Sequence, residues 1–305
     1  MAGEILVSIC STTYNHAPYI RQCLDGFLMQ QVNFKYEILI HDDASTDGTD
    51  EIIKEYAAKY PDIIKPLYEE VNQYSTDNPK GMAYWNFSRA KGKYIAMCEG
   101  DDYWTDPLKL QKQVDFLERH TDYVLCTHHF FRFDQNVACY YENNSTIQLE
   151  DFTYDIDYYI KYNNWVTQPL TSLFRLDSLC LLDFMNLPIK KDTVLFYEIL
   201  KNGKGLLMKE PMGVYRIHSS GVWTGIEPCE QSRSNILAIK SIYVNEESTL
   251  AAKYLYNCLL CHGYLGLTFF KRYMDLYIQV MFIIFKNFGL RLTFKLVLKS
   301  IIFAK

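Results

Sequence analysis

The stretch Cys98-Glu99-Gly100-Asp101-Asp102-Tyr103-Trp104 follows a short β-prone apolar run at residues 93–97. Two adjacent carboxylates at the end of a buried strand are unfavourable unless a cation pairs with them. The pattern indicates a divalent metal site that holds a phosphate-bearing ligand. Alternatively, the segment is a strand-to-helix loop in which Asp102 or Asp106 caps a helix that begins near Pro107. The two interpretations are compatible.

On both sides of this stretch, apolar strand-like runs alternate with amphipathic segments. We expect strands at residues 5–10, 36–41, 63–69 and 93–97, and helices at residues 17–31, 49–60, 81–90 and 107–120. This alternation is typical of βαβ units, and it predicts an α/β fold with a mostly parallel sheet. Polar loops at 11–15, 42–48 and 99–104 each follow a strand. They should therefore meet at the carboxyl edge of the sheet, where ligands bind in such folds.

Two common nucleotide-binding patterns are missing from the sequence. No Gly-x-Gly-x-x-Gly turn follows the first strand, and there is no Walker-type Gly-Lys-Ser. Dinucleotide redox chemistry and P-loop hydrolysis therefore lack their main sequence feature. Because carboxylates repel phosphate unless a metal bridges them, the polar loops point to a nucleoside diphosphate held through a cation.

Composition limits the class of protein further. A chain of 305 residues with 49% hydrophobic and 22% charged residues is ordered and globular, and it is long enough for one large domain plus an appendage. A net charge of −5 argues against a general nucleic-acid binder. Nine cysteines without tight spacing indicate reduced thiols, and residues 1–9 lack the basic region of a signal peptide. We therefore expect a cytoplasmic protein.

Four motifs occur in order along the chain: Thr12-Thr13-Tyr14-Asn15, the acidic run 42–49, residues 90–95 and Glu99-Gly100-Asp101-Asp102. This set resembles the family 2 glycosyltransferases with the GT-A fold over roughly residues 4–225, and it looks closest to bacterial members that build surface polysaccharides. The resemblance implies a Rossmann-like, mostly parallel sheet flanked by helices in a nucleotide-sugar-binding catalytic domain at 1–228. A helical C-terminal region would follow at 229–305.

The resemblance also implies roles for individual residues in nucleotide binding. In that family, the positions of Thr12 and Tyr14 line the nucleobase pocket, with Asn15 in the same loop, and the position of Asp43 hydrogen-bonds the uracil ring. Asp101 matches a carboxylate near the ribose. Asp102 matches the carboxylate that holds Mg²⁺ or Mn²⁺ on the diphosphate.

Two further roles are implied later in the chain. Asp192 stands where the family carries its general base, although an acid just before an apolar helix is ordinarily an N-cap. His218 resembles a late histidine that reaches the metal or the diphosphate in many relatives, although a lone histidine after a strand is usually structural. Both alternatives stay open at this point.

The chain departs from the family pattern at Met82 and Ala83, where many members carry an Arg-Asn pair. Asn86 and Arg89 are nearby polar candidates for the same contacts. Residues 134–165 are rich in Asn, Asp and Tyr, and we expect a long variable loop there. Its aromatic side chains would either stack on sugar rings or form packed surface.

The C-terminal tail is apolar and basic. Residues 276–285 are too short to span a bilayer, and the basic residues after them are interleaved with apolar ones. Phe285, Phe288, Leu292 and Leu296 are spaced to share one helix face. The pattern predicts a helix in an anionic membrane interface at the inner face of the cytoplasmic membrane. The alternative is a helix packed on the catalytic domain or on a second subunit.

Together, the residues and the resemblance predict an inverting, metal-dependent glycosyltransferase. It would move a sugar from a UDP-linked donor to a hydroxyl of a glycan or lipid-linked oligosaccharide in surface-polysaccharide synthesis. A sugar-nucleotide nucleotidyltransferase is disfavoured, because it needs a Gly-rich, basic loop where this chain has residues 11–14. A catalytically inactive scaffold at the membrane predicts loss of Asp102 or Asp192, and both are present.

Overall fold

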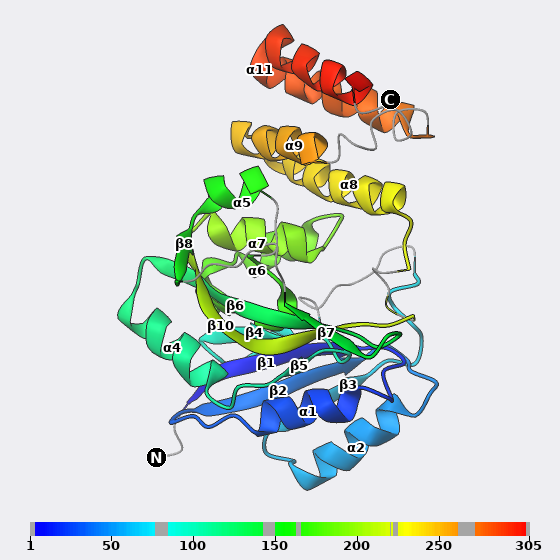
Figure 1. Ribbon diagram of the computed structural model, residues 1–305. Coiled ribbons are helices and arrows are strands. Elements are labelled where there is room, and N and C mark those ends of the chain that lie inside the picture. Colours follow the sequence, from blue (N-terminus) through cyan, green and yellow to red (C-terminus); the bar gives the residue numbers. More distant parts are fainter. Residues whose placement is uncertain are drawn as a thin grey trace. The chain divides into compact units, whose positions relative to one another are not determined.

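The computed structural model describes residues 4–76, 85–142, 150–162, 166–219, 221, 225–261 and 272–302. The chain divides into two compact units (Figure 1). The first unit consists of Met1–Asp155, Trp165–Met185 and Glu198–His218, and the second of Ile156–Asn164, Asn186–Tyr197 and Ser219–Lys305.

The first unit is built on a central sheet. Its strands are β1 (Ile5–Thr13), β2 (Lys35–Asp42), β3 (Ile64–Tyr68), β4 (Tyr94–Met97), β5 (Tyr103–Trp104), β6 (Tyr123–Asp134), β7 (Cys139–Glu142), β8 (Phe152–Tyr154), β9 (Leu173–Arg175) and β10 (Lys204–Ile217). The strand order is β3-β2-β1-β4-β9-β6-β10-β5, with β7 on β6 and β8 on β10. Strands β3, β2, β1 and β4 run parallel to one another, and β6 runs parallel to β10. Strand β9 lies between β4 and β6 and is antiparallel to both.

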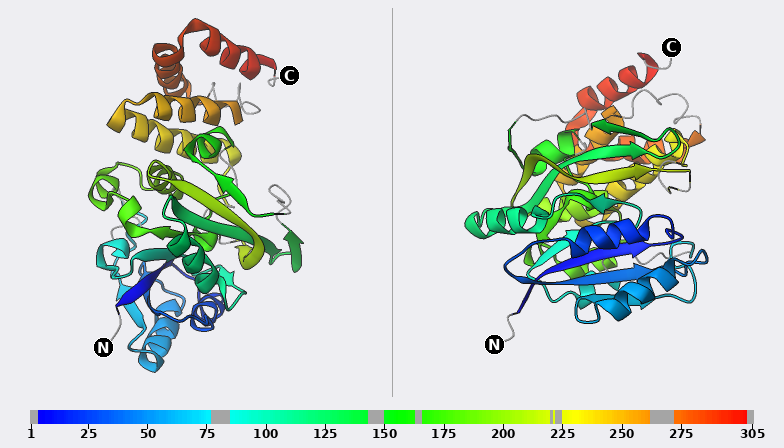
Figure 2. Two further views of the ribbon diagram at one scale, coloured as in Figure 1. Left: turned by 90° about the vertical axis from the view of Figure 1, so that its left-hand side faces the viewer. Right: turned by 60° about the horizontal axis from the view of Figure 1, so that its bottom comes forward.

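Helices cover this sheet. They are α1 (Ile20–Leu28), α2 (Thr49–Lys59) and α4 (Lys109–Arg119), with short 3₁₀ turns η1 (Phe87–Arg89), η3 (Pro169–Thr171) and η4 (Leu176–Ser178). Figure 2 shows α1 and α2 on one side of the β1–β2 part of the sheet. Strand β4 is wholly buried and apolar, and β1 and β2 are buried over most of their length, as expected for parallel strands covered on both faces. The predicted α/β fold with a mostly parallel sheet flanked by helices is confirmed.

The prediction of a long loop at residues 134–165 is wrong for the described part of that region. Strands β7 and β8 and helix α5 (Ile156–Tyr162) form there. The first of these strands pairs antiparallel with the end of β6, and the second with the distant β10. Because such short strands are defined by their partners, their polar local composition conceals them. The predicted helix at 81–90 lies partly outside the described residues, and its described end forms η1.

The second unit contains the predicted C-terminal helices. Helices α8 (Pro228–Glu246), α9 (Thr249–Cys261) and α11 (Met274–Ile302) follow one another, and α9 packs against α5, α8 and α11. Two further helices, α6 (Leu181–Asn186) and α7 (Asp192–Leu200), lie where the chain passes between the units. Among the described residues, we find no helix with the length and hydropathy needed to cross a membrane.

Helix α11 is divided at Gly289, whose backbone is not helical (φ 73°, ψ −177°). The predicted single face of Phe285, Phe288, Leu292 and Leu296 is therefore wrong, because the break changes the direction of the residues that follow. Leu296 is also only 2% exposed. The exposed apolar side chains of the first segment are Met274, Ile278, Phe282 and Phe285. Their spacing places them on one face of a regular helix.

Candidate active site at the carboxyl edge of the sheet

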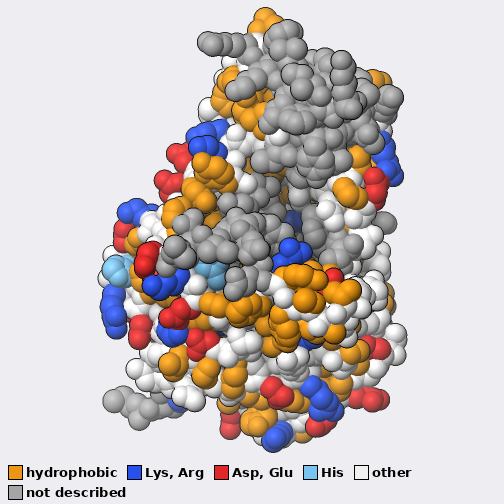
Figure 3. Space-filling model, viewed as in Figure 1, with side chains coloured by type: hydrophobic (Ala, Val, Ile, Leu, Met, Phe, Trp, Pro, Cys, Tyr) orange, Lys and Arg blue, Asp and Glu red, His pale blue; other side chains and the backbone are white. Residues whose placement is uncertain are grey.

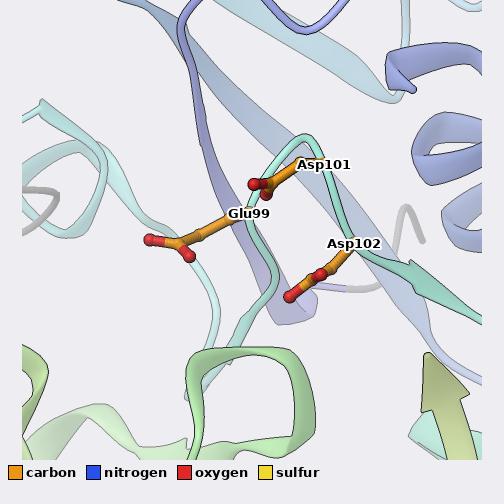
Figure 4. A group of neighbouring side chains, drawn as sticks. All are labelled: Glu99, Asp101 and Asp102. Carbon is orange, nitrogen blue, oxygen red and sulfur yellow. The ribbon is translucent and has the colours of Figure 1, made fainter. Parts of the chain in front are cut away.

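The loop between β4 and β5 carries three carboxylates that point to the same side (Figure 4). Glu99, Asp101 and Asp102 each offer an oxygen, and these atoms lie within 4.8 Å of one another. In the described part of the chain this is the one such group of acidic, histidine or cysteine side chains. We call residues 99–102 the acidic loop.

The acidic loop packs directly on the end of β1. The Gly100 N–H donates to the Thr12 carbonyl at 3.0 Å. Position 100 has no room for a side chain, because a Cβ there would lie 2.7 Å from Thr13 Oγ1 and 3.0 Å from His16 Nδ1. The Asp43 N–H in turn donates to the Thr13 carbonyl at 3.0 Å. The three predicted polar loops therefore meet at the end of β1.

Asp102 is a buried carboxylate, 3% exposed. Its Oδ1 accepts the backbone N–H of Arg216 at 2.8 Å. The Arg216 guanidinium is turned elsewhere: Nε donates to the Asp101 carbonyl and Nη2 donates to Gln22 Oε1. Burial, and then the charge of Asp101, raise the pKa of Asp102 well above its ordinary value. Within the described residues no cationic side chain pairs with this carboxylate.

Asp101 lies between two histidines. Its Oδ2 is 3.1 Å from His218 Nε2 and 3.7 Å from His16 Nε2, whereas its Oδ1 is buried and finds no hydrogen-bond partner in the described part of the chain. Burial acts to raise the pKa of Asp101, but the hydrogen bond with His218 and the two histidine charges outweigh it and lower the pKa. The His218 ring packs 4.6 Å from the Tyr19 ring. His218 therefore faces Asp101 and is not part of the three-carboxylate group.

The loops after β1 and β2, residues 14–17 and 43–49, are tied together, and we call them the donor loops. Asn15 has a positive φ of 54°. Its N–H donates to Ser45 Oγ at 2.9 Å, and its Oδ1 accepts the Thr46 N–H at 2.8 Å. Asp47 accepts the Ala17 N–H at 3.0 Å. Asn15 thus positions the two loops against each other.

The remaining predicted nucleotide residues lie around these loops. Thr12 is half-buried at the end of β1, and Tyr14 is exposed. Asp43 is buried, and its two oxygens accept the backbone N–H groups of Gln73 at 2.7 Å and Tyr74 at 3.0 Å. These bonds hold the segment after β3. Because each carboxylate oxygen has two lone pairs, Asp43 can still accept a further donor.

Asn86 and Arg89 serve the main chain. Asn86 Nδ2 donates to the Ser11 carbonyl at 2.8 Å. Arg89 donates to the carbonyls of Lys65 and Ile40, which joins η1 to strands β3 and β2. Their side-chain groups are engaged by the fold itself, so the structure favours a structural role over the phosphate or ribose contacts suggested by the sequence. Positions 82 and 83 lie outside the described residues.

A fully buried lysine, Lys109, packs against Trp104 of β5, the strand that follows the acidic loop. Lys109 Nζ lies 4.0 Å from the centre of the Trp104 ring and donates to Gln113 Oε1 at 2.7 Å. Burial lowers the pKa of Lys109 to about 7. At the start of the same helix, Asp106 Oδ1 accepts the Leu108 N–H at 2.8 Å. Asp106, and not Asp102, therefore supports the beginning of α4.

Asp192 is the first residue of α7, and its Oδ1 accepts the Thr193 N–H at 2.8 Å. It belongs to the second unit, whereas the acidic loop belongs to the first. The donor of this hydrogen bond is the next residue, whereas the side chain of an N-cap accepts the N–H two or three positions further along the helix.

Comparison with known proteins identifies the family. Residues 8–182, more than half of the chain, match the family described as "Glycosyl transferase family 2". The chain belongs to this family. An uncharacterized protein of Mycobacterium tuberculosis is 37% identical over 217 residues, which is 71% of this chain and 60% of that protein. The chain thus spans about 60% of the length of this relative.

Two further likenesses bear on the subgroup and the fold of this family 2 member. The Bacillus subtilis protein TuaG, whose name links it to teichuronic acid biosynthesis, is 34% identical over 113 residues, 37% of this chain and 42% of that protein. Staphylococcus aureus TarS 1–349 in complex with UDP-GlcNAc superposes with a TM-score of 0.70, covering 98% of this chain and 89% of that one. At 16% identity, the TarS likeness shows the fold alone. The predicted resemblance to surface-polysaccharide members of family 2 is confirmed.

The sequence patterns did not identify two residues of this site, His16 and Arg216. His16 follows the predicted loop motif directly, and its position after Asn15 was the available signal. Arg216 is a lone charge in the otherwise apolar end of β10, and a buried charge of this kind usually has a functional or pairing reason. The nucleotide, metal and catalytic roles of the predicted residues stay predictions.

Proposed function

We propose that this chain is an inverting, metal-dependent glycosyltransferase. It moves a sugar from a UDP-sugar to a hydroxyl of a glycan or lipid-linked oligosaccharide in surface-polysaccharide synthesis. The observation that carries the proposal is the group of Glu99, Asp101 and Asp102, in which Asp102 is buried and pairs with no cationic side chain of the described residues. Membership of family 2 supports the reaction, and the likeness to a protein bound to UDP-GlcNAc is compatible with the donor class.

The donor set fits a divalent cation. Three carboxylates are the oxygen ligands that Mg²⁺ and Mn²⁺ prefer. Asp101 Oδ1 is buried and has no hydrogen-bond partner among the described residues. Burial and the charge of Asp101 raise the pKa of Asp102, and a bound cation would oppose both effects. Asp102 would hold the metal, with Asp101 and Glu99 beside it. When bound, such a metal supplies charge neutralisation for a departing diphosphate.

His218 is our second proposed metal or diphosphate contact. Its Nε2 lies 3.1 Å from Asp101 Oδ2, so a direct contact through Nε2 requires that this hydrogen bond be exchanged for the new one. While the bond is in place, His218 orients Asp101.

The chain's own residues would divide the reaction between binding and proton transfer. Asp43 would accept the uracil N3–H, and Thr12, Tyr14 and Asn15 would form the base pocket, with Asp101 near the ribose. Asp192 would take the proton from the acceptor hydroxyl as its oxygen bonds to the anomeric carbon. The bond from that carbon to the diphosphate breaks, and UDP leaves. One displacement of this kind inverts the configuration.

Calorimetric titration tests the donor and the metal together. We expect UDP to bind in the presence of Mn²⁺ and to lose most of its affinity in EDTA, because the acidic loop repels the diphosphate without a cation. Equal affinity in EDTA would reject the metal-dependent part of the proposal. A panel of nucleotide sugars, followed by NMR of the product's anomeric proton, identifies the donor and tests inversion.

We further propose that α11 attaches the protein to the inner face of the cytoplasmic membrane. Support comes from its exposed apolar side chains at 274, 278, 282 and 285, next to exposed Lys286 and the basic residues that follow in the sequence. The double variant Ile278→Ser/Phe282→Ser should lose flotation with anionic vesicles at low salt. Leu182→Ser, an equally exposed leucine in α6, is the matched control. A full-length chain that does not float points instead to packing on a second subunit.

A further inference from the structure

A row of side chains in the first unit crosses four strands on one face of the sheet. Tyr103 on β5 lies opposite Val214 on β10, Arg216 lies opposite Phe133 on β6, and Phe133 lies opposite Tyr140 on β7. Since alternate residues of a strand share a face, Tyr103, Arg216, Phe133 and Tyr140 are on the same face. We call these four residues the aromatic row.

Contacts within the row fix its outermost ring. The hydroxyl oxygens of Tyr103 and Tyr140 are 3.1 Å apart, and the Phe133 and Tyr140 ring centres are 4.5 Å apart. The Arg216 guanidinium lies 5.0 Å from the centre of the Tyr103 ring. Tyr103 is buried, 6% exposed, whereas Tyr140 is 57% exposed. An aromatic ring that is held by its neighbours and still open to solvent is a preorganised binding surface.

The surface around this ring is apolar. In Figure 3, hydrophobic side chains gather where Figure 1 places the β6–β7 hairpin. Val137, Tyr140 and Tyr141 of the hairpin are exposed. Exposed aromatic groups of this kind mark interaction sites more often than isolated apolar residues do.

The aromatic row begins at the acidic loop. Tyr103 follows Asp102 directly in the chain, and the Arg216 N–H donates to Asp102 Oδ1 at 2.8 Å. The donor loops follow β1 and β2, which lie on one side of β4 in the strand order, whereas β6, β10 and β5 lie on the other. The acidic loop therefore has the donor loops on one side and the aromatic row on the other.

We infer that the aromatic row, with Tyr140 as its exposed member, binds a pyranose ring of the acceptor glycan. The inference rests on the proposed function. The C–H face of a sugar ring is apolar and packs on an aromatic ring, while a tyrosine hydroxyl at the edge exchanges hydrogen bonds with sugar hydroxyls. If the donor loops hold the donor nucleotide, the side of the acidic loop that carries the aromatic row is available to the acceptor.

Saturation-transfer NMR on the full chain tests the inference. The probes are methyl glycosides of the common hexoses and N-acetylhexosamines, with UDP and Mn²⁺ present. Tyr140→Ala and Tyr140→Leu should weaken glycoside binding about threefold to tenfold, the scale of one lost aromatic contact. Tyr141→Ala is the matched control, because this neighbour is 47% exposed and points to the opposite face of β7. UDP affinity should be unchanged in all three variants.

Each other outcome has a separate meaning. A wild-type chain that binds UDP and none of the glycosides overturns the aromatic row as a sugar site and leaves the proposed function intact. Failure to bind UDP is a failure of the proposed function. Equal losses of glycoside affinity in the Tyr140 and Tyr141 variants overturn the inference. A change of oligomeric state in Tyr140→Leu, measured by sedimentation, also overturns it and assigns this face to self-association.

Discussion

The donor loops and the acidic loop use their carboxylates differently. Asp47 accepts the N–H groups of Ala17 and Thr49 and the Thr49 hydroxyl. Burial acts to raise the pKa of Asp47, but these hydrogen bonds lower it below its ordinary value. In the acidic loop, Asp102 has a raised pKa, and Asp101 Oδ1 has no hydrogen-bond partner within the described residues.

This difference separates two uses of an acidic side chain. A carboxylate whose oxygens are taken up by main-chain donors builds the loop that carries it. A buried carboxylate that has a second negative charge beside it and few hydrogen-bond donors around it marks the place where an external cation is expected. Substitutions in the acidic loop and in the donor loops should therefore have different consequences. The expected effects are given below from the largest to the smallest.

The largest effect is expected for Asp102→Asn. The amide keeps the shape and removes the charge that a hard cation needs, so turnover should fall by about 10²- to 10³-fold or more. The metal-free variant should be at least as stable as the wild type, because a buried unpaired charge is removed. Product formation and thermal unfolding, each with and without Mn²⁺, measure this. Asp106→Asn is the control, and sugar transfer by Asp102→Asn at the wild-type rate contradicts the metal role.

Asp192→Asn separates a base from a helix cap. Asparagine caps helices about as well as aspartate, so stability should be retained. The asparagine amide cannot take the proton that a general base accepts, so kcat should fall by roughly 10²- to 10⁴-fold, with UDP affinity unchanged. Steady-state kinetics and calorimetry measure both. If kcat is near normal for Asp192→Asn and only Asp192→Ala loses stability, the residue is a cap alone.

Asp43→Ala tests the donor loops. Removing this acceptor should weaken UDP binding by about 1–3 kcal/mol, roughly 5- to 150-fold, because the uracil N3–H is left without a partner. Asp47→Asn is the comparison, since Asp47 serves only the loops and its loss should lower the melting temperature more than it lowers UDP affinity. Equal UDP affinity in Asp43→Ala and the wild type removes Asp43 from the nucleotide site.

The smallest effect concerns Lys109, which packs against Trp104 of β5. Its pKa is about 7 when folded, because of burial, against 10.5 for an ordinary lysine. Between these values the unfolded chain binds more protons, so the contribution of Lys109 to stability rises with pH from about 7 to about 10.5. Lys109→Met should therefore be more stable than the wild type near pH 7, with the difference shrinking towards about pH 10. Thermal unfolding across this range shows it, with exposed Lys35→Met as a control. A difference that does not depend on pH contradicts the lowered pKa.

Sequence patterns predicted the parallel part of the fold well and the antiparallel part poorly. Strands β1, β2 and β4 each contain consecutive buried apolar residues, because both faces are covered, and this is visible locally. Strands β5 and β9 have two and three residues, too few for any period, and β7 and β8 depend on partners elsewhere in the chain. Pairing over such distances is a tertiary property.

The same limit applies to the site. The polar loops could be predicted to meet because strand ends share one edge, and Thr12 and Thr13 do join them. The contact of Arg216 with Asp102 spans 114 positions, and no local pattern contains it. Nothing in the spacing of residues 42–49 indicates that Asp43 holds the backbone of Gln73 and Tyr74.

Gly100 has a consequence for anyone who wishes to re-engineer this protein. Its missing side chain lets the acidic loop rest on Thr13 and His16 with no space left over. Mutations that enlarge either of those residues to alter the choice of nucleotide would push on the backbone between Glu99 and Asp101. Libraries aimed at donor specificity should therefore keep positions 13, 16 and 100 fixed and vary the exposed Tyr14, where a new side chain has room to move.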